Sequence, residues 1–137
     1  MNIFVYGTLM DQEIMGSVSG DQFKFQKAHL NNYVRKRVRG EVYPAIIGQN
    51  NSLVDGILYF DVSAEAVDRL DRFEGSQYVR NEVLVSCDNG ELVQAQTYII
   101  AAESVDQLAA ENWSFKNFLQ TGKAEFKKNY QGFEKLG

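Results

Sequence analysis

The sequence predicts an α+β fold, in which a small, curved or barrel-like mixed β-sheet carries a few packed helices. Two observations lead to this prediction: segments with strand patterns are short and numerous, and helical patterns do not alternate with them but come late in the chain. Strict alternation would instead favour a doubly wound α/β fold. The chain has no internal repeat, low-complexity stretch or Gly/Ser/Pro linker, so we expect a single domain over residues 1–137.

Five segments have strand patterns, the second of them irregular: residues 2–6, 22–27, 54–60, 78–87 and 92–100. The last two flank Asp88-Asn89-Gly90, which predicts a hairpin turn because Asn and Gly accept positive φ angles. Gly56 lies inside the third segment, where a glycine indicates a bulge or the close approach of another backbone.

The clearest helix is predicted for residues 62–75, with Ser63 as its N-cap and Gly75 as its C-terminal stop. Shorter helices are expected for residues 104–108, for 113–119 with an end near Gly122, and for 124–130.

Composition excludes several classes of partner. Hydrophobic residues make up 45% of the chain and charged residues 23%, as in an ordinary globular domain. No apolar run approaches the roughly 20 residues of a membrane span, and the first residues lack a signal-peptide pattern, so we expect no membrane association and a mature chain that begins at Met1. A net charge of -4 argues against nucleic acid as a partner. Cys87 is the only cysteine, which fits a reducing, cytoplasmic location and a structural role for this residue.

The chain also lacks the parts for several common chemistries. His29 is its only histidine and Cys87 its only thiol, so a zinc-type cluster cannot be assembled and we expect no metal. Phosphate-binding loops and hydrolase elbows have no matching motif, and we expect no cofactor. His29 is interpreted as structural. Acid–base chemistry would then fall to a carboxylate, a tyrosine or a lysine.

The turn Tyr6-Gly7-Thr8-Leu9 is the first candidate for a ligand site. Gly7 interrupts an apolar strand, gives the backbone conformational freedom, and exposes successive N–H groups that can converge on a carboxylate or phosphate. The alternative is an ordinary strand end with a glycine turn.

Glu74 is the second candidate. It follows Val67 and Leu70 on one face of the predicted helix, so its carboxyl lies in the stripe that should face the core. Desolvation and the negative end of the helix dipole would raise its pKa, which suits a group that takes and returns protons. Alternatively, the side chain swings into solvent or pairs with Arg80. The other charged residues of this helix are interpreted as surface charge: Asp68, Arg69, Asp71 and Arg72.

Two basic segments keep two interpretations each. Residues 35–39 read Arg-Lys-Arg-Val-Arg. Such charges suit an edge strand or loop that is protected from aggregation, and they equally suit an anion site at the mouth of a cleft. Pro44, which follows, should end any central strand. Residues 112–137 carry five lysines and two glutamates, which suits a solvated helix face or a docking surface.

Five motifs in order resemble the gamma-glutamylcyclotransferase-like family, which includes gamma-glutamylamine cyclotransferases and many uncharacterised bacterial and plant members. They cover roughly residues 1–100: V-Y-G-T-L at 5–9, Y-P-A-I at 43–46, V-D-G-I-L-Y at 54–59, L-D-R-F-E-G-S-Q-Y-V-R at 70–80 and A-Q-T-Y-I at 95–99. The first and fourth motifs together are specific.

The resemblance implies a barrel-like fold with one deep cavity and a small-molecule gamma-glutamyl substrate. It implies that Tyr6, Gly7, Thr8 and Leu9 cradle the α-carboxylate and amine end of that substrate, and that Glu74 is the acid–base residue of a cofactor-independent cyclisation. The products would be 5-oxoproline and a free amine or amino acid. Tyr78 is a weaker candidate, which with Tyr59 and Tyr98 could stabilise the oxyanion or simply line the barrel.

Two other classes of function stay open. The chain could be a non-catalytic binding domain for a carboxylate-bearing metabolite in the same cavity. It could also be a docking module that uses Trp113 and Phe118 of the C-terminal segment. The sequence decides neither the leaving amine nor the oligomeric state.

Overall fold

The computed structural model describes residues 1–129, and in this part of the chain the strands form one sheet with the order β3-β1-β5-β4-β2-β6. Strand β3 also pairs with β2, which closes five of the strands into a barrel and leaves β6 on the free side of β2. The strands are β1 (Ile3–Val5), β2 (Phe25–Val38), β3 (Pro44–Tyr59), β4 (Tyr78–Cys87), β5 (Leu92–Ile100) and β6 (Leu108–Asn112). The predicted α+β class and barrel-like mixed sheet are confirmed, since β1 runs parallel to β5 and antiparallel to β3.

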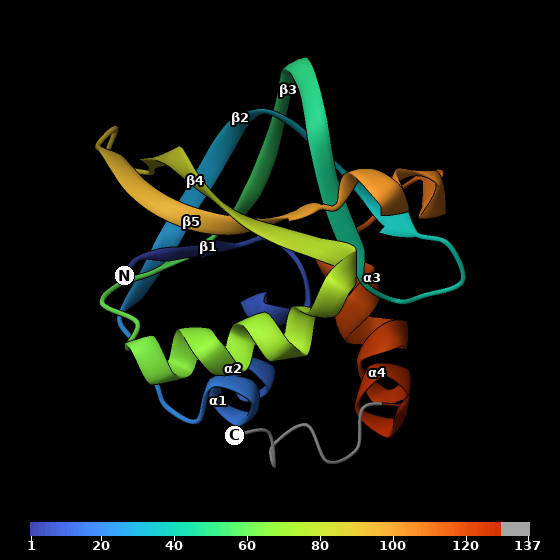
Figure 1. Cartoon of the computed structure of the whole chain (residues 1–137), viewed down its shortest axis with the longest axis horizontal. Coiled ribbons are helices and arrows are strands. Elements are labelled where there is room, and N and C mark those ends of the chain that lie inside the picture. The colour runs from blue at the N-terminus through green and yellow to red at the C-terminus, as the bar shows by residue number, and fades with distance from the viewer. Residues whose placement is uncertain (130–137) are drawn as a thin grey trace.

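The helices gather mainly at one side of this barrel, where α1, α2 and α4 lie below the strands in Figure 1. They are α1 (Gln12–Ser19), α2 (Ala64–Glu74), α3 (Phe115–Asn117) and α4 (Lys123–Asn129). Short 3-10 segments occur at η1 (Thr8–Met10), η2 (Gly75–Gln77) and η3 (Ala102–Gln107), and one π-helical turn at η4 (Phe118–Gly122). Of the helices within residues 1–129, none combines the length and the apolar character that crossing a membrane requires.

The elements with the strongest sequence patterns are confirmed. Strands β4 and β5 have the predicted bounds and pair in continuous antiparallel register from Tyr78–Ile100 to Ser86–Leu92. Helix α2 begins after Ser63, whose side chain accepts a hydrogen bond from the Ala66 amide, and ends at Gly75. Gly56 marks a close backbone approach, because a Cβ there would lie 2.2 Å from the Val5 carbonyl oxygen.

The predicted strands covered only part of the long hairpin that β2 and β3 form. The predicted strand ended at residue 27, but β2 continues to Val38 and pairs with β3 along most of its length. Its polar residues do not alternate cleanly, so the backbone pairing with β3, and not the side-chain pattern, keeps the segment extended. Pro44 does not end a strand but is the first residue of β3, where a missing N–H costs no ladder hydrogen bond.

The expectation that helices come only late in the chain was wrong, because α1 follows η1 directly. Its N-cap is Asp11, whose Oδ1 accepts from the amides of Glu13 and Ile14 at 3.0 and 3.2 Å, and its C-cap is Gly20 in the left-handed conformation. Asp11 and Gly20 are typical cap residues, but the apolar stripe between them was too short to predict a helix. The helix expected at 104–108 is instead the 3-10 segment η3, followed by β6.

Two large buried clusters form most of the core within residues 1–129, beside a smaller one of Val38, Ala45 and Ile100. One lies on the strands and fills the barrel, and it includes Cys87, which is 2% exposed as its predicted structural role requires. The other joins the strands to the helices and includes Trp113 and Phe118, which are 7% and 3% exposed. Because both aromatic side chains are buried, the docking module built on them is not supported.

The C-terminal lysines do not form a uniformly solvated face. Lys123 pairs with Asp11 at 2.8 Å, and Lys127 pairs with Glu13 at 2.5 Å, so two of them fasten α4 to α1. The predicted helix over 124–130 corresponds to α4, except that its last residue and the rest of the tail lie outside the described residues.

Candidate functional site

A cavity of about 70 Å³ opens where one end of the barrel meets the helices. Its walls come from five places: β1 with the turn that follows, the end of α2 with η2, the neighbouring starts of β3 and β4, Tyr98 of β5, and α4. Glu74 and the turn of Tyr6, Gly7, Thr8 and Leu9 line the same cavity, together with the weaker candidate Tyr78. Residues separated by nearly 70 positions in the sequence are therefore brought to one site.

The turn needs glycine for space and not for a special backbone angle. Gly7 has a φ of -131°, outside the left-handed region, but a Cβ at this position would lie 2.8 Å from Cγ and Cδ of Pro44. The amides of Thr8 and Leu9 open the 3-10 segment η1 and donate to no acceptor within residues 1–129. These N–H groups are available to a ligand.

Arg35 supports the turn from the barrel side. Its Nη1 donates to the carbonyl oxygens of Tyr6 at 2.8 Å and Asp55 at 3.0 Å, and its guanidinium lies 5.3 Å from the centre of the Trp113 ring. The next residue of the basic stretch, Lys36, donates to Asn112 at the edge of the sheet. Within the described part of the chain, no side chain of residues 35–39 lines this cavity.

Glu74 is the last residue of α2, in the same stripe as the buried Val67 and Leu70. Glu74 is half-buried and lines the cavity. Burial, and secondly the charge of Asp71, raises the pKa of Glu74 from 4.5 to about 8. Among residues 1–129 no group donates a hydrogen bond to this carboxyl, so both of its oxygens can meet a ligand.

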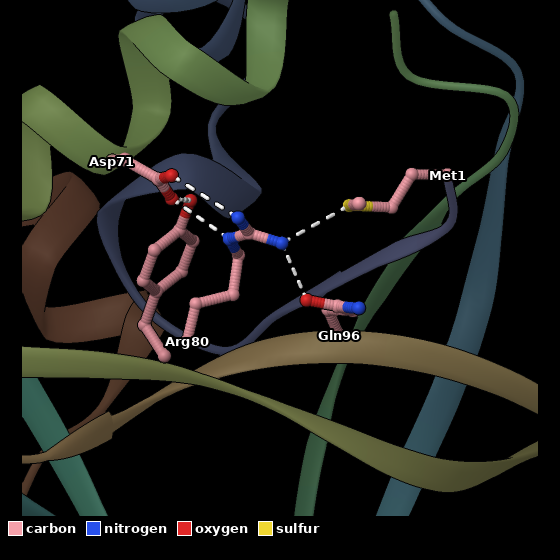
Figure 2. Close-up of polar contacts among 5 residues, drawn as sticks. Met1, Asp71, Arg80 and Gln96 are labelled. Carbon is pink, nitrogen blue, oxygen red and sulfur yellow. Dashed lines mark hydrogen bonds and ion pairs between the residues drawn. The ribbon is translucent and has the colours of Figure 1, made fainter. Parts of the chain in front are cut away.

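Arg80 pairs with Asp71 and not with Glu74. Arg80 Nε lies 2.9 Å from Asp71 Oδ1, while Nη1 donates to Gln96 and reaches the sulfur of Met1 at 3.4 Å. Figure 2 shows the guanidinium between Asp71 on one side and Gln96 and Met1 on the other. The interpretation of Asp71 as plain surface charge was therefore wrong, and its spacing of three residues from Glu74 was the signal that could have revealed it.

The other three charged residues of α2 that were interpreted as surface charge make two kinds of contact. Asp68 and Arg72 form the predicted exposed pair four residues apart. Arg69 instead donates from Nε to the carbonyl oxygen of Val18 at 2.9 Å and ties α2 to α1.

The tyrosine hydroxyls near the cavity donate their protons to protein acceptors. Tyr98 donates to Asp71 Oδ1 at 2.6 Å. Burial raises the pKa of Tyr59 to about 12 and raises the pKa of Tyr98 further, so both groups stay protonated. The remaining donations go to carbonyl oxygens: Tyr6 to Tyr98 at 2.5 Å, Tyr59 to Leu9 at 2.9 Å and Tyr78 to Pro44 at 2.7 Å. Since a hydroxyl has one proton, these tyrosines hold the walls in place and do not offer that proton to a substrate oxyanion in this arrangement.

Comparison with known proteins is decisive for the family. The profile described as "Gamma-glutamyl cyclotransferase, AIG2-like" matches residues 3–115, which includes the turn, Glu74 and all of the barrel strands. The chain belongs to this family. The resemblance seen in the sequence motifs is thereby confirmed.

Individual proteins are similar to the chain in sequence or in fold. The AIG2-like protein D of Arabidopsis thaliana is 30% identical over 121 residues, which cover 87% of this chain and 79% of that protein. A solution structure of another Arabidopsis thaliana protein superimposes with a TM-score of 0.72 at 24% identity, covering 98% of this chain and 90% of that one. A structure named gamma-glutamyl cyclotransferase has the same fold, with a TM-score of 0.64 at 16% identity over 98% of this chain and 85% of that chain.

Proposed function

We propose that the protein is a gamma-glutamyl cyclotransferase that releases 5-oxoproline and a free amine or amino acid, with Glu74 as its general acid and base. One observation carries the proposal: a carboxyl group with a raised pKa and no hydrogen-bond donor of its own lines the same cavity as a turn with two unpaired amides. Membership of the family supports the type of reaction.

The reaction needs no nucleophile from the protein. The α-amine of the gamma-glutamyl group attacks its own γ-carbonyl carbon, a C–N bond forms to close a five-membered ring, and the bond to the leaving nitrogen breaks. The attacking nitrogen loses a proton and the leaving nitrogen gains one, so one carboxyl placed between them serves both steps. Holding the chain folded back contributes much of the rate, because well-oriented intramolecular reactions reach effective molarities of about 10⁵ to 10⁸ M.

The turn is suited to hold the amino-acid end of the substrate. Thr8 and Leu9 present adjacent N–H groups, and such groups bind a carboxylate where the surroundings exclude water. Arg35 fixes the Tyr6 carbonyl just before them, which holds the turn against the barrel. The α-carboxylate would then be anchored while the α-amine points toward Glu74.

The raised pKa of Glu74 fits both halves of the proton transfer. With a pKa of about 8, most of the carboxyl is protonated in the empty cavity at neutral pH. A bound substrate brings an ammonium group, and this positive charge favours the ionised carboxylate, which can then accept the proton. The resulting carboxylic acid is strong enough to return the proton to the leaving nitrogen.

The test is release of 5-oxoproline, measured by mass spectrometry over a panel of gamma-glutamyl amines and gamma-glutamyl amino acids. Glu74→Gln should keep the fold and lower turnover by at least about 10². Glu65→Gln, an exposed residue on the same helix, is the matched control and should turn over normally.

Two outcomes would contradict the proposal. Unchanged product release by Glu74→Gln would remove this residue from the mechanism. Binding of the panel by the wild-type protein, with no product from any member, would favour the non-catalytic binding domain.

A further inference from the structure

We propose that α4 forms the wall of the cavity that contacts the leaving group, and that the ring of Phe126 limits the size of the group that is accepted. This inference rests on the proposed cyclotransferase function and deepens it. Within residues 1–129, Phe126 is the only cavity-lining side chain that comes from beyond residue 115.

Phe126 is built firmly into this position. It is 1% exposed, and its ring makes edge-on contacts with Phe73 and Phe118 at centroid distances of 5.9 Å each. Phe73 directly precedes Glu74, so the ring of Phe126 packs against the residue next to the proposed acid–base group. A change in the size of this ring is therefore felt beside the reacting atoms.

The helix that carries Phe126 is fastened beside the turn that is proposed to anchor the substrate. Lys123 Nζ lies 2.8 Å from Oδ2 of Asp11, a residue that is 8% exposed and whose other oxygen caps α1. Asp11 comes directly after η1. One turn of helix further along α4, Lys127 donates to Glu13. These contacts hold α4 at a fixed place relative to Thr8 and Leu9.

The chemistry of the walls indicates which part of the substrate meets Phe126. The amino-acid end is charged and needs the amides of the turn and the carboxyl of Glu74. The ring of Phe126 offers no hydrogen bond and no charge, so it suits the part of the substrate that requires neither. Beyond the γ-carbonyl, that part is the carbon skeleton attached to the leaving nitrogen.

The range of residues that the family profile matches separates the same two parts of the site. The profile of the gamma-glutamyl cyclotransferase, AIG2-like family ends at residue 115, so the turn and Glu74 lie inside it and α4 lies outside it. The features proposed for the shared chemistry thus come from the matched region. The wall proposed to choose the leaving group comes from a segment beyond it.

The test compares two ring-reducing variants over a series of gamma-glutamyl amines, from methylamine to benzylamine. Phe126→Leu retains a buried apolar side chain, and Phe126→Ala removes the ring entirely. Relative to wild type, we expect the ratio of kcat/KM for benzylamine over methylamine derivatives to rise by about tenfold or more, since differences in hydrophobic pocket size are worth that much. Leu119→Ala, exposed on the preceding helical turn, should leave the ratio unchanged.

A second readout separates a specificity wall from a general packing defect. The affinity for 5-oxoproline, which has no leaving group, should be the same within about twofold in wild type and Phe126→Leu. An unchanged ratio of kcat/KM for benzylamine over methylamine derivatives would overturn the assignment. So would an affinity for 5-oxoproline that falls in Phe126→Leu as much as the affinity for whole substrates does.

The same experiment separates failure of this assignment from failure of the proposed cyclotransferase function. If wild type binds the series without releasing product, the cyclotransferase proposal fails, and the same size ratio is then read from dissociation constants. If wild type binds none of the compounds, both proposals fail. Turnover by wild type with unchanged ratios in the Phe126 variants overturns only the assignment of α4.

Discussion

The carboxylate of Asp71 accepts a hydrogen bond of 2.6 Å from the hydroxyl of Tyr98, which joins α2 to the barrel at the edge of the cavity. Arg80 pairs with the same carboxylate from β4. Asp71 is thus held in place as a fixed negative charge, three residues before Glu74 on the helix. This arrangement explains why the charge of Asp71 adds to burial in raising the pKa of Glu74.

Asp71→Asn should lower the pKa of Glu74 from about 8, because it removes the nearby negative charge and leaves Arg80 without its partner. The titration of Glu74 can be followed by carbon NMR of selectively labelled glutamate side chains, with Glu74→Gln to assign the signal. Asp68→Asn changes an exposed charge that pairs with Arg72 on the same helix and should have little effect. A Glu74 pKa that does not fall in Asp71→Asn would show that burial alone sets it.

Glu74 should also make stability depend on pH. Its pKa is higher in the folded protein than the usual 4.5, so folding takes up a proton between about pH 4.5 and pH 8. The contribution of Glu74 to the stability of the fold is therefore fully present below pH 4.5 and is lost as the pH rises through about 8. Glu74→Gln should match the wild-type Tm near pH 4 and exceed it near pH 9, by about 10 °C, since each pKa unit of the shift is worth about 1.4 kcal/mol. Equal Tm differences at the two pH values would contradict the raised pKa.

Tyr98→Phe tests whether this hydroxyl acts on the substrate or on the protein. Because its proton goes to Asp71, we expect the variant to lose stability, by about 1.5 to 3 kcal/mol for a hydrogen bond to a charged group, but to keep turnover within about tenfold. Loss of an oxyanion donor would instead cost about 10² to 10³ in kcat. Urea unfolding and the 5-oxoproline assay measure the two effects separately.

Three glycine-to-alanine changes should differ in a predictable order. Gly56→Ala places a Cβ 2.2 Å from the backbone oxygen of Val5 and should be strongly destabilising, by more than about 3 kcal/mol, since backbone atoms of the barrel must shift. Gly7→Ala meets the ring of Pro44 at 2.8 Å and should distort the turn, with a larger effect on substrate binding than on unfolding. Gly16→Ala, in α1 with no neighbour within 4 Å, is the control and should be stabilising by up to about 1 kcal/mol. Urea unfolding curves give the ranking, and a Gly56→Ala variant as stable as wild type would contradict the close approach.

Local patterns predicted the best-defined elements of this protein. The hairpin of β4 and β5 follows from alternation and an Asn-Gly turn, and α2 follows from its cap residues and apolar stripe. The same stripe showed Glu74 turned toward the core. These features depend on residues that are neighbours in the sequence, so physical rules for turns, caps and helix faces are enough to find them.

Only the tertiary structure decided how the site is assembled. Barrel closure keeps β2 extended through a polar segment, places Arg35 behind the Tyr6 carbonyl, and brings Pro44 close enough to require Gly7. Packing of α2 on the barrel joins Asp71 to Tyr98, and packing of α4 brings Phe126 to the cavity. These are contacts between residues far apart in the chain, and no local pattern encodes them. The sequence alone indicated the residues that we propose for the chemistry, while long-range packing determined what surrounds Glu74 and therefore why its pKa is raised.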